Sequence, residues 1–147
     1  IHFALPHLIA SKGMVVAITS IQSKIGVPLH TGYVASKHAL QGFCESLRME
    51  LDGTGVDILT VLPHWLRGTD LRRNAFDKDG NAIGTSSREH SKESISLEAA
   101  ARSIMTAIHK RKRSLIIPWK LRLLLILNLF IPTWAEMLIK GAVRKQD

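Results

Sequence analysis

The stretch GMVVAITS, residues Gly13 to Ser20, decides the fold. It begins at the glycine of a Lys-Gly pair, which is typical of the end of a helix. Five apolar residues follow, Met14 to Ile18, with no charged side chain among them. Such a run, rich in β-branched residues, is typical of a strand buried on both faces of a parallel sheet. We therefore predict a buried strand that follows directly on a helix.

A long helix and a second buried strand come next along the chain. Thr31 to Leu51 has helical periodicity, and VDILTVLP, Val56 to Pro63, is another apolar run. The residues DGTG break the chain between them. We predict that one stripe of the helix faces the sheet. The members of this stripe are Ala35, Ala39, Phe43, Leu47 and Leu51.

The rest of the chain continues the alternation of strands and helices. Ser96 or the residue beside it is placed to cap a helix from Leu97 to about Lys110, and SLIIPW, residues 114–119, predicts a short third strand. Residues 120–145 are helical in pattern, and Pro132 divides them. This alternation predicts an α/β fold, a doubly wound parallel sheet of about three strands with a helical carboxyl-terminal segment. The long polar stretch of residues 64–95 has the character of a functional loop.

Charge and cysteine content limit the classes of function. The 147-residue chain has a net charge of +8, and residues 101–147 hold all of this excess, with ten Lys or Arg against Glu136 and Asp147. This basic region has no aromatic interleaving, zinc-ligand spacing or helix-turn-helix pattern, which argues against a nucleic-acid partner. The one cysteine, Cys44, excludes an intrachain disulfide and suits a reducing, cytoplasmic compartment. The seven histidines show no metal-ligand spacing, so no metal site is predicted.

The only tyrosine of the chain, Tyr33, lies four residues before Lys37 in TGYVASKHAL. This spacing puts both side chains on one face of the predicted helix. A free phenol titrates at about pH 10, and an adjacent ammonium stabilises its ionised form. The pair could then exchange a proton with an alcohol or carbonyl oxygen, which Ser20 at the end of the first strand would hold in place. On spacing alone, a surface tyrosine beside a solvated lysine is the alternative interpretation.

In order and spacing, these motifs resemble the catalytic half of the short-chain dehydrogenases/reductases. The similarity is carried by VVAITS, by the thirteen residues from Ser20 to Tyr33, and by YVASKHALQGFCESLRMEL. It extends to LPHLIASKG before the first strand, to the second strand as far as Pro63, and to SLEAAARSIMTAI. The resemblance implies a Rossmann-like fold and hydride transfer between NAD or NADP and an alcohol or carbonyl substrate.

The resemblance also implies a role for each residue of the proposed catalytic set. Tyr33 would be the acid–base residue, Lys37 would favour its ionised form and bind the nicotinamide ribose, and Ser20 would hydrogen-bond the substrate oxygen. Residues 64–95 would form the substrate loop. Members of the family assemble as dimers or tetramers, often through the helix that carries this tyrosine, so a homo-oligomer is expected.

The resemblance implies two further cofactor contacts, although the residues between them depart from the family pattern. Pro63 matches the end of the second strand, but His64 stands where the family usually has glycine. Gly68 then adds one residue before Thr69, which in the family contacts the nicotinamide carboxamide. Pro63 and Thr69 are therefore expected to bind the cofactor. His64 would either close over the substrate or serve only as a loop residue.

Two family features have no counterpart in the printed sequence. These are the glycine-rich turn that seats the pyrophosphate on a helix N-terminus and an asparagine that completes a proton relay. We expect both before Ile1, so that residues 1–147 form a partial nucleotide-binding domain with an amino-terminal half still missing. The alternative is a truncated, catalytically incompetent remnant that acts as an interaction or membrane-surface module.

The carboxyl-terminal segment has its own pattern. LLLILNLFIPTWA, residues 123–135, is uncharged but shorter than the ~20 residues that a membrane span needs. Basic side chains flank it at Lys110–Arg113, Lys120, Arg122, Lys140, Arg144 and Lys145. One interpretation is peripheral contact of residues 110–145 with an anionic membrane. The other is a flap over a lipophilic pocket, or packing against another subunit. The apolar tail of residues 120–147 favours a lipophilic alcohol or ketone as substrate.

Overall fold

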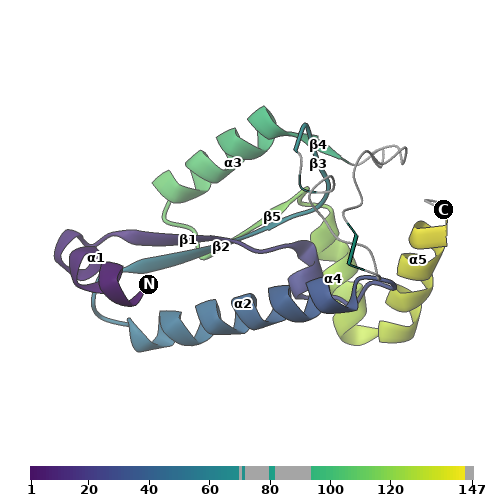
Figure 1. The fold of residues 1–147 in the computed structure, drawn as a ribbon, viewed down its shortest axis with the longest axis horizontal. Helices are drawn as coiled ribbons and strands as arrows, with labels where there is room; N and C mark the ends of the chain where they lie inside the picture. Colours follow the sequence, from purple (N-terminus) through teal and green to yellow (C-terminus); the bar gives the residue numbers. More distant parts are fainter. Residues whose placement is uncertain (70, 72–79, 82–93, 145–147) are drawn as a thin grey trace.

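A three-stranded parallel sheet lies at the centre of the computed structural model, which describes residues 1–69, 71, 80–81 and 94–144 (Figure 1). The strands are β1 (Met14–Ile18), β2 (Asp57–Pro63) and β5 (Ser114–Ile117), and their order is β1-β2-β5. Both pairings are parallel, so the carboxyl ends of all three strands meet at one edge of the sheet. The predicted α/β fold with three apolar strands is confirmed.

Helices surround the sheet and connect its strands. The helical elements are η1 (His2–Ala4), α1 (Leu5–Ser11), η2 (Ile21–Ser23), α2 (Thr31–Glu50), α3 (Leu97–His109), α4 (Leu121–Phe130) and α5 (Pro132–Arg144). The Ser96 hydroxyl accepts a hydrogen bond of 3.2 Å from the Ala99 N–H and so caps α3 as predicted. Pro132 stands at the first position of α5 and separates it from α4, as the sequence indicated.

The two faces of the sheet are covered by different helices, with α2 on one face and α3 on the other (Figure 1). Because side chains alternate along a strand, Val15, Ala17 and Ile58 face α2. Val16 and Val61 face α3 on the opposite side. Each buried aliphatic side chain contributes roughly 1.5 to 3 kcal/mol to folding, so both helices are held to the sheet mainly by apolar burial.

The buried face of α2 differs from the predicted stripe. Cys44 and Leu47 are buried against the sheet, whereas Ala35 and Ala39 are exposed and Phe43 is 49% exposed. A repeat of four residues advances by about 40° per step on an α-helix, so the four steps from the first member of the stripe to the last leave the face on which they began. The stripe was therefore wrong at its amino-terminal members and right only near its carboxyl-terminal end.

Residues 64–95 contain more regular structure than the sequence predicted. A two-residue strand, β3 (Leu66–Arg67), pairs in parallel with β4 (Ile95–Ser96), directly before α3. This pair brings the start and the end of the predicted loop together. It forms a sheet of its own, apart from the three-stranded sheet. Most of the remaining loop, on which the predicted substrate contacts fall, lies outside the described residues.

At the amino edge of the sheet, one arginine joins three chain segments. Arg111 pairs through its Nε with the carboxylate of Asp57 at the start of β2. Its Nη2 donates hydrogen bonds to the backbone oxygens of Lys12 (3.1 Å), Gly13 (3.4 Å) and Gly55 (3.0 Å). These acceptors precede β1 and β2, so Arg111 holds the two strand starts together. Its backbone is left-handed, with a φ of 46°.

The basic run at residues 110–113 therefore lies at the amino edge of the sheet. The helices α4 and α5 follow the carboxyl end of β5 and lie at the other end of the molecule (Figure 1). The sequence placed this run among the charges that flank the apolar tail. In the structure, β5 lies between the run of residues 110–113 and the helices α4 and α5. The basic residues that do lie beside these two helices are Lys120, Arg122, Lys140 and Arg144.

The carboxyl edge of the sheet is closed by α4 and α5. Ile139 of α5 is buried with Ile21 and Ile25 of the η2 region, and Leu121 and Leu124 of α4 pack against the same cluster. The inner face of the apolar tail therefore packs on the η2 region of the same chain, and the flap over a lipophilic pocket and the subunit contact stay predictions. Within the described part of the chain, none of the helices combines the length and the apolar character needed to cross a bilayer.

Candidate active site

The side chains of Tyr33 and Lys37 lie at the amino-terminal end of α2, which begins at Thr31. The Lys37 ammonium is 5.5 Å from the centre of the Tyr33 ring. It also donates a hydrogen bond of 3.4 Å to the backbone oxygen of Ile18, the last residue of β1. The lysine thus joins the start of α2 to the carboxyl edge of the sheet. Within the described residues, no group hydrogen-bonds the Tyr33 hydroxyl or uses the other Lys37 N–H groups.

Ser20 follows two residues after the end of β1 and is 7% exposed. Its backbone is extended, and its hydroxyl oxygen accepts a hydrogen bond of 3.2 Å from the Gln22 N–H. The oxygen is therefore occupied as an acceptor, while the hydroxyl hydrogen has no acceptor among the described residues. A serine held in this way can donate a hydrogen bond to a ligand oxygen.

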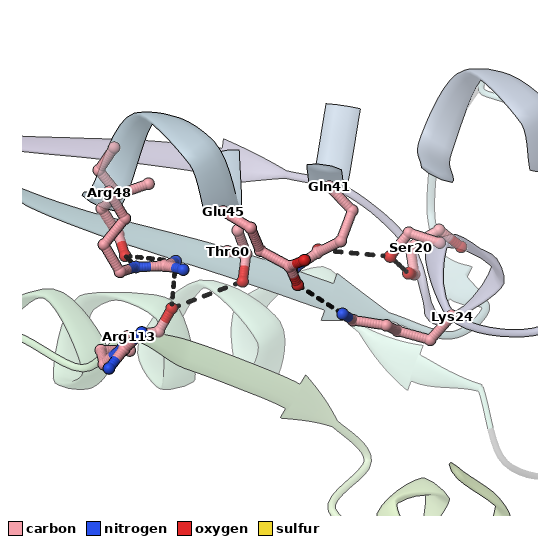
Figure 2. Close-up of polar contacts among 9 residues, drawn as sticks. Ser20, Lys24, Gln41, Glu45, Arg48, Thr60 and Arg113 are labelled. Atoms are coloured by element: carbon pink, nitrogen blue, oxygen red, sulfur yellow. Dashed lines mark hydrogen bonds and ion pairs between the residues drawn. The ribbon is translucent and has the colours of Figure 1, made fainter. Parts of the chain in front are cut away.

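A network of polar side chains holds the Ser20 turn against α2 (Figure 2). The Ser23 hydroxyl donates a hydrogen bond of 2.7 Å to the Ser20 backbone oxygen and lies 3.5 Å from Oε1 of Gln41. Gln41 in turn donates to Glu45 at 2.8 Å, and Lys24 pairs with the same carboxylate at 2.5 Å. The Lys24 and Gln41 hydrogen bonds hold the pKa of Glu45 below its ordinary value.

Farther along α2, Arg48 bonds the backbone of the sheet (Figure 2). Its guanidinium donates to the Ile58 oxygen, with Nη2 at 3.0 Å, and to the Arg113 oxygen at 3.3 Å. The Ile58 oxygen lies where β2 extends beyond the start of β5, whereas the Arg113 oxygen also accepts a hydrogen bond of 3.1 Å from the Thr60 N–H. Arg48 therefore satisfies backbone acceptors and fixes α2 along the sheet.

Thr19 is a buried residue of the site that the sequence reasoning missed. Its backbone N–H and its hydroxyl both donate to the Val61 oxygen, at 2.8 and 2.9 Å. These bonds continue the β1–β2 pairing past Ile18 and fix the residue directly before Ser20. A threonine between a buried apolar run and the candidate serine was the available signal, because a buried hydroxyl needs a partner.

The two predicted cofactor contacts after β2 lie in different surroundings. Pro63 ends β2 opposite Ile117 and is half-buried, and the His64 N–H donates to the Ile117 oxygen at 2.8 Å. Thr69 is exposed and follows Gly68, whose φ of 80° turns the chain after β3. No hydrogen bond joins Thr69 to Tyr33 or Lys37 within the described residues. The structure therefore groups Ser20 and Lys37 at the carboxyl edge, with Tyr33 beside the lysine.

This edge offers a proton donor, a hydrogen-bond donor and a cation. The Tyr33 hydroxyl can give a proton to an oxygen, and Ser20 can hold that oxygen. The half-buried Lys37 ammonium keeps N–H groups for ligand hydroxyls such as those of a ribose. The carboxyl edge of a parallel sheet is also where α/β proteins bind nucleotides. In the part of the chain described here, no group of His, Cys, Asp and Glu side chains is arranged to hold a metal ion.

Comparison with curated proteins gives relatives that match part of the chain. Dehydrogenase/reductase SDR family member 7B of Xenopus laevis is 33% identical over 114 residues, which cover 77% of this chain and 35% of that protein. The 7B protein of Rattus norvegicus is 33% identical over the same length and is covered to 34%. Member 7C of Xenopus tropicalis is 47% identical over 64 residues. The chain spans about a third of the length of the 7B relatives it matches.

Solved structures and a family model agree on the fold. A short chain dehydrogenase from Burkholderia cenocepacia, solved in complex with NADP, superposes with a TM-score of 0.70 at 18% identity and covers 91% of this chain and 50% of its own. One from Streptomyces avermitilis gives a TM-score of 0.65 at 23% identity, over 97% and 56%. The short chain dehydrogenase model matches residues 1–80, from α1 through the Ser20 turn, α2 and β2. The chain belongs to the short chain dehydrogenase family.

Proposed function

We propose that the chain carries the proton-transfer half of an oxidoreductase that moves a hydride between NAD(P)(H) and an alcohol or carbonyl compound. One observation carries the proposal. The Lys37 ammonium lies 3.4 Å from the Ile18 oxygen and 5.5 Å from the Tyr33 ring, so the Tyr–Lys pair sits at the strand end that leads into Ser20. The hydrogen bond to Ile18 holds the lysine beside the end of β1, which supports this proposal over an unconstrained surface pair.

In the direction of reduction, Tyr33 and Ser20 act on the carbonyl oxygen of the substrate. Ser20 donates a hydrogen bond to this oxygen and orients the carbonyl carbon. When bound, a reduced nicotinamide would supply a hydride for that carbon. Tyr33 gives its hydroxyl proton to the oxygen as the C–O bond becomes single, and the resulting phenolate is stabilised by the Lys37 ammonium. A proton from solvent then restores the Tyr33 hydroxyl.

The cofactor of the proposed reaction is NAD or NADP. Lys37 would hold the ribose hydroxyls with the N–H groups that Ile18 leaves free, while Pro63 and Thr69 would contact the nicotinamide end. The Burkholderia relative of similar fold was solved with NADP, which supports this assignment. Seating the pyrophosphate needs a glycine-rich turn after a strand, which the printed sequence does not contain.

The substrate and the partners complete the proposal. Residues 64–95 would form the substrate loop, because the chain leaves the three-stranded sheet at the carboxyl end of β2 and continues into β3. The apolar α4 and α5 at this edge favour a lipophilic alcohol or ketone, and these two helices with the basic residues beside them would bring the protein to a membrane surface. A homo-oligomer would form through the exposed face of α2, which carries Phe43 and Met49.

A chimera tests the proposed reaction. Residues 1–147 replace the matching part of the Xenopus laevis 7B protein, and reduction of a panel of ketones is followed by NADPH or NADH absorbance. We expect Tyr33→Phe to lower kcat/KM by about 10²- to 10⁴-fold, the usual contribution of general acid catalysis. Ser36→Ala, one helical turn away, is the matched control. Full activity of the Tyr33→Phe chimera would exclude the proposed role.

The rival proposal is a catalytically incompetent remnant that acts as an interaction or membrane-surface module. It is favoured by the lack of a glycine-rich turn in the printed sequence. Fluorescence titration of the 147-residue chain with NADPH separates the two. We expect the chain alone to bind poorly and the chimera to bind well. Micromolar binding by the chain alone would contradict this expectation, and an inactive, correctly folded chimera would favour the remnant.

A further inference from the structure

The outer faces of α4 and α5 are apolar and exposed to solvent. From Trp119 to the end of α4, exposed side chains at Trp119, Leu123, Ile126 and Phe130 recur every three or four residues, which places them on one side of the helix, and the neighbours of Phe130 in the sequence are exposed as well. Their counterparts on α5 follow the same spacing. The exposed apolar residues of this hairpin are Trp119, Leu123, Ile126, Leu129, Phe130, Ile131, Trp134, Met137 and Leu138. We call them the hairpin surface.

The hairpin surface is distinct from the apolar residues that hold the hairpin in place. Leu121, Leu124 and Leu125 of α4, with Ile139 of α5, turn inward and pack on Ile21 and the residues around it. The inner face is therefore already used in folding. The outer residues contribute nothing to that core; Leu129, for example, is 73% exposed. An exposed cluster of this kind usually marks a binding surface.

Four basic side chains lie on the same two helices or directly beside them. They are Lys120, Arg122, Lys140 and Arg144, all exposed. Glu136 is the one acidic residue of residues 119–144, and it pairs with Lys140 at 3.4 Å. The hairpin therefore has four positive charges against one negative, a net charge of +3. Trp119 and Trp134, each 65% exposed, add the amphipathic rings that favour a membrane–water interface.

We propose that the hairpin surface docks on an anionic lipid membrane, with its apolar side chains inserted between headgroups and its basic side chains paired with lipid phosphates. Apolar area and positive charge together are what such surfaces bind. The hairpin packs on the η2 region directly after Ser20, so docking would bring the carboxyl edge of the sheet close to the lipid. Resting on the proposed function, this arrangement lets a lipid-dissolved ketone or alcohol reach the site.

A second copy of the chain is a less suitable occupant. A twofold contact presents the same surface on both sides. Two hairpins, each with a net charge of +3, would then face one another, and like charges across an interface oppose association. Lipid phosphates supply the opposite charge. The charge of the hairpin therefore favours the membrane over a self-contact.

Vesicle flotation of the 147-residue chain tests the proposal without any need for activity. Vesicles of phosphatidylcholine alone are compared with vesicles that contain 30% phosphatidylserine, at low and high salt. We expect flotation with the anionic vesicles and a blue shift of tryptophan fluorescence. Lys120→Gln and Arg122→Gln should each lower the partition coefficient by about fivefold. A Leu129→Ser, Trp134→Ser double variant should lose flotation.

Matched variants on α3 control for nonspecific loss. Met105→Ser removes an exposed apolar side chain, and Arg102→Gln removes an exposed charge, away from the hairpin. Both should float like the parent chain, and circular dichroism should show all variants folded. No flotation at low salt, or equal loss in the α3 variants, would overturn the proposal. So would hairpin variants that dissociate a dimer in sedimentation without vesicles. Because no step of this test uses turnover, its failure leaves the proposed reaction untouched.

Discussion

The hydroxyl of Ser23 donates a hydrogen bond of 2.7 Å to the backbone oxygen of Ser20, inside the turn that presents the Ser20 side chain. Ser23 is 2% exposed, so water cannot replace this bond. We expect Ser23→Ala to lower the free energy of unfolding by about 1 kcal/mol, measured by urea denaturation. Ser36→Ala removes a bond of similar length, 2.7 Å to the Tyr33 oxygen, at an exposed position. It should cost less than about 0.5 kcal/mol, and equal losses would contradict the role of burial.

Arg111 should be the most important basic residue for stability in the run of residues 110–113. Arg111→Ala removes the pairing with Asp57 and the bonds to three backbone oxygens. We expect a loss of about 1 to 2 kcal/mol in the free energy of unfolding, moderated by solvent exposure. Alanine meets the same strain as arginine at a φ of 46°, so the change isolates the side chain. Arg113→Ala is the control and should stay within about 0.5 kcal/mol.

Glu45 should make stability depend on acid pH. The hydrogen bonds from Lys24 and Gln41 lower the pKa of Glu45 from its ordinary 4.5. A carboxylate with a lowered pKa in the folded state stabilises the fold above about pH 4.5, and this contribution is lost as pH falls through the folded value. Glu45→Gln should therefore flatten the fall in urea midpoint between pH 6 and pH 3 relative to the parent chain.

Lys24→Gln tests the cause assigned to this pH dependence. It removes the first partner of the Glu45 carboxylate and leaves the carboxylate in place. The fall in urea midpoint should flatten in the same direction as in Glu45→Gln. A Glu45→Gln chain with the full pH dependence of the parent would show that other carboxylates are responsible.

Cys44 should be inert in the folded chain. Its side chain is 1% exposed, and burial raises the pKa of the thiol, which lowers the thiolate population. We expect dithiobis(nitrobenzoic acid) to label the native chain at least about 10²-fold more slowly than the chain in guanidinium, since labelling requires opening of the α2–sheet interface. Native-state labelling at the rate of a free thiol would contradict the packing of α2 on the sheet.

The sequence predicted the elements of this fold because each carries a local signal. The apolar runs of β1 and β2 are too β-branched and too short for helices, and Ser96 and Pro132 mark helix starts by their own backbone chemistry. The face of α2 was less predictable. Residues repeated every four positions drift around an α-helix, so such a repeat predicts the buried face only over a few residues. The apolar Phe43 was assigned to the buried face although it is exposed.

Contacts between distant segments could not be predicted from local patterns. Arg111 bonds the oxygen of Gly13, 98 positions earlier, and only the completed sheet brings them together. The same is true of Ser23 and Gln41, which meet because α2 folds back across η2. The spacing of Tyr33 and Lys37 gave their common face, but the Lys37 bond to Ile18 depends on the crossover from β1 to α2.

Because Lys37 bonds the end of β1, the proposed catalytic residues and the regions proposed to select the substrate can change independently during evolution. Ser20, Tyr33 and Lys37 all belong to a single strand-to-helix crossover, so one uninterrupted segment of eighteen residues encodes the proposed proton-transfer chemistry. The regions proposed to choose the substrate, residues 64–95 and the hairpin, are encoded elsewhere. Substitutions, insertions or exchanges in those regions can therefore alter which molecule is processed while the inherited chemical unit stays unchanged.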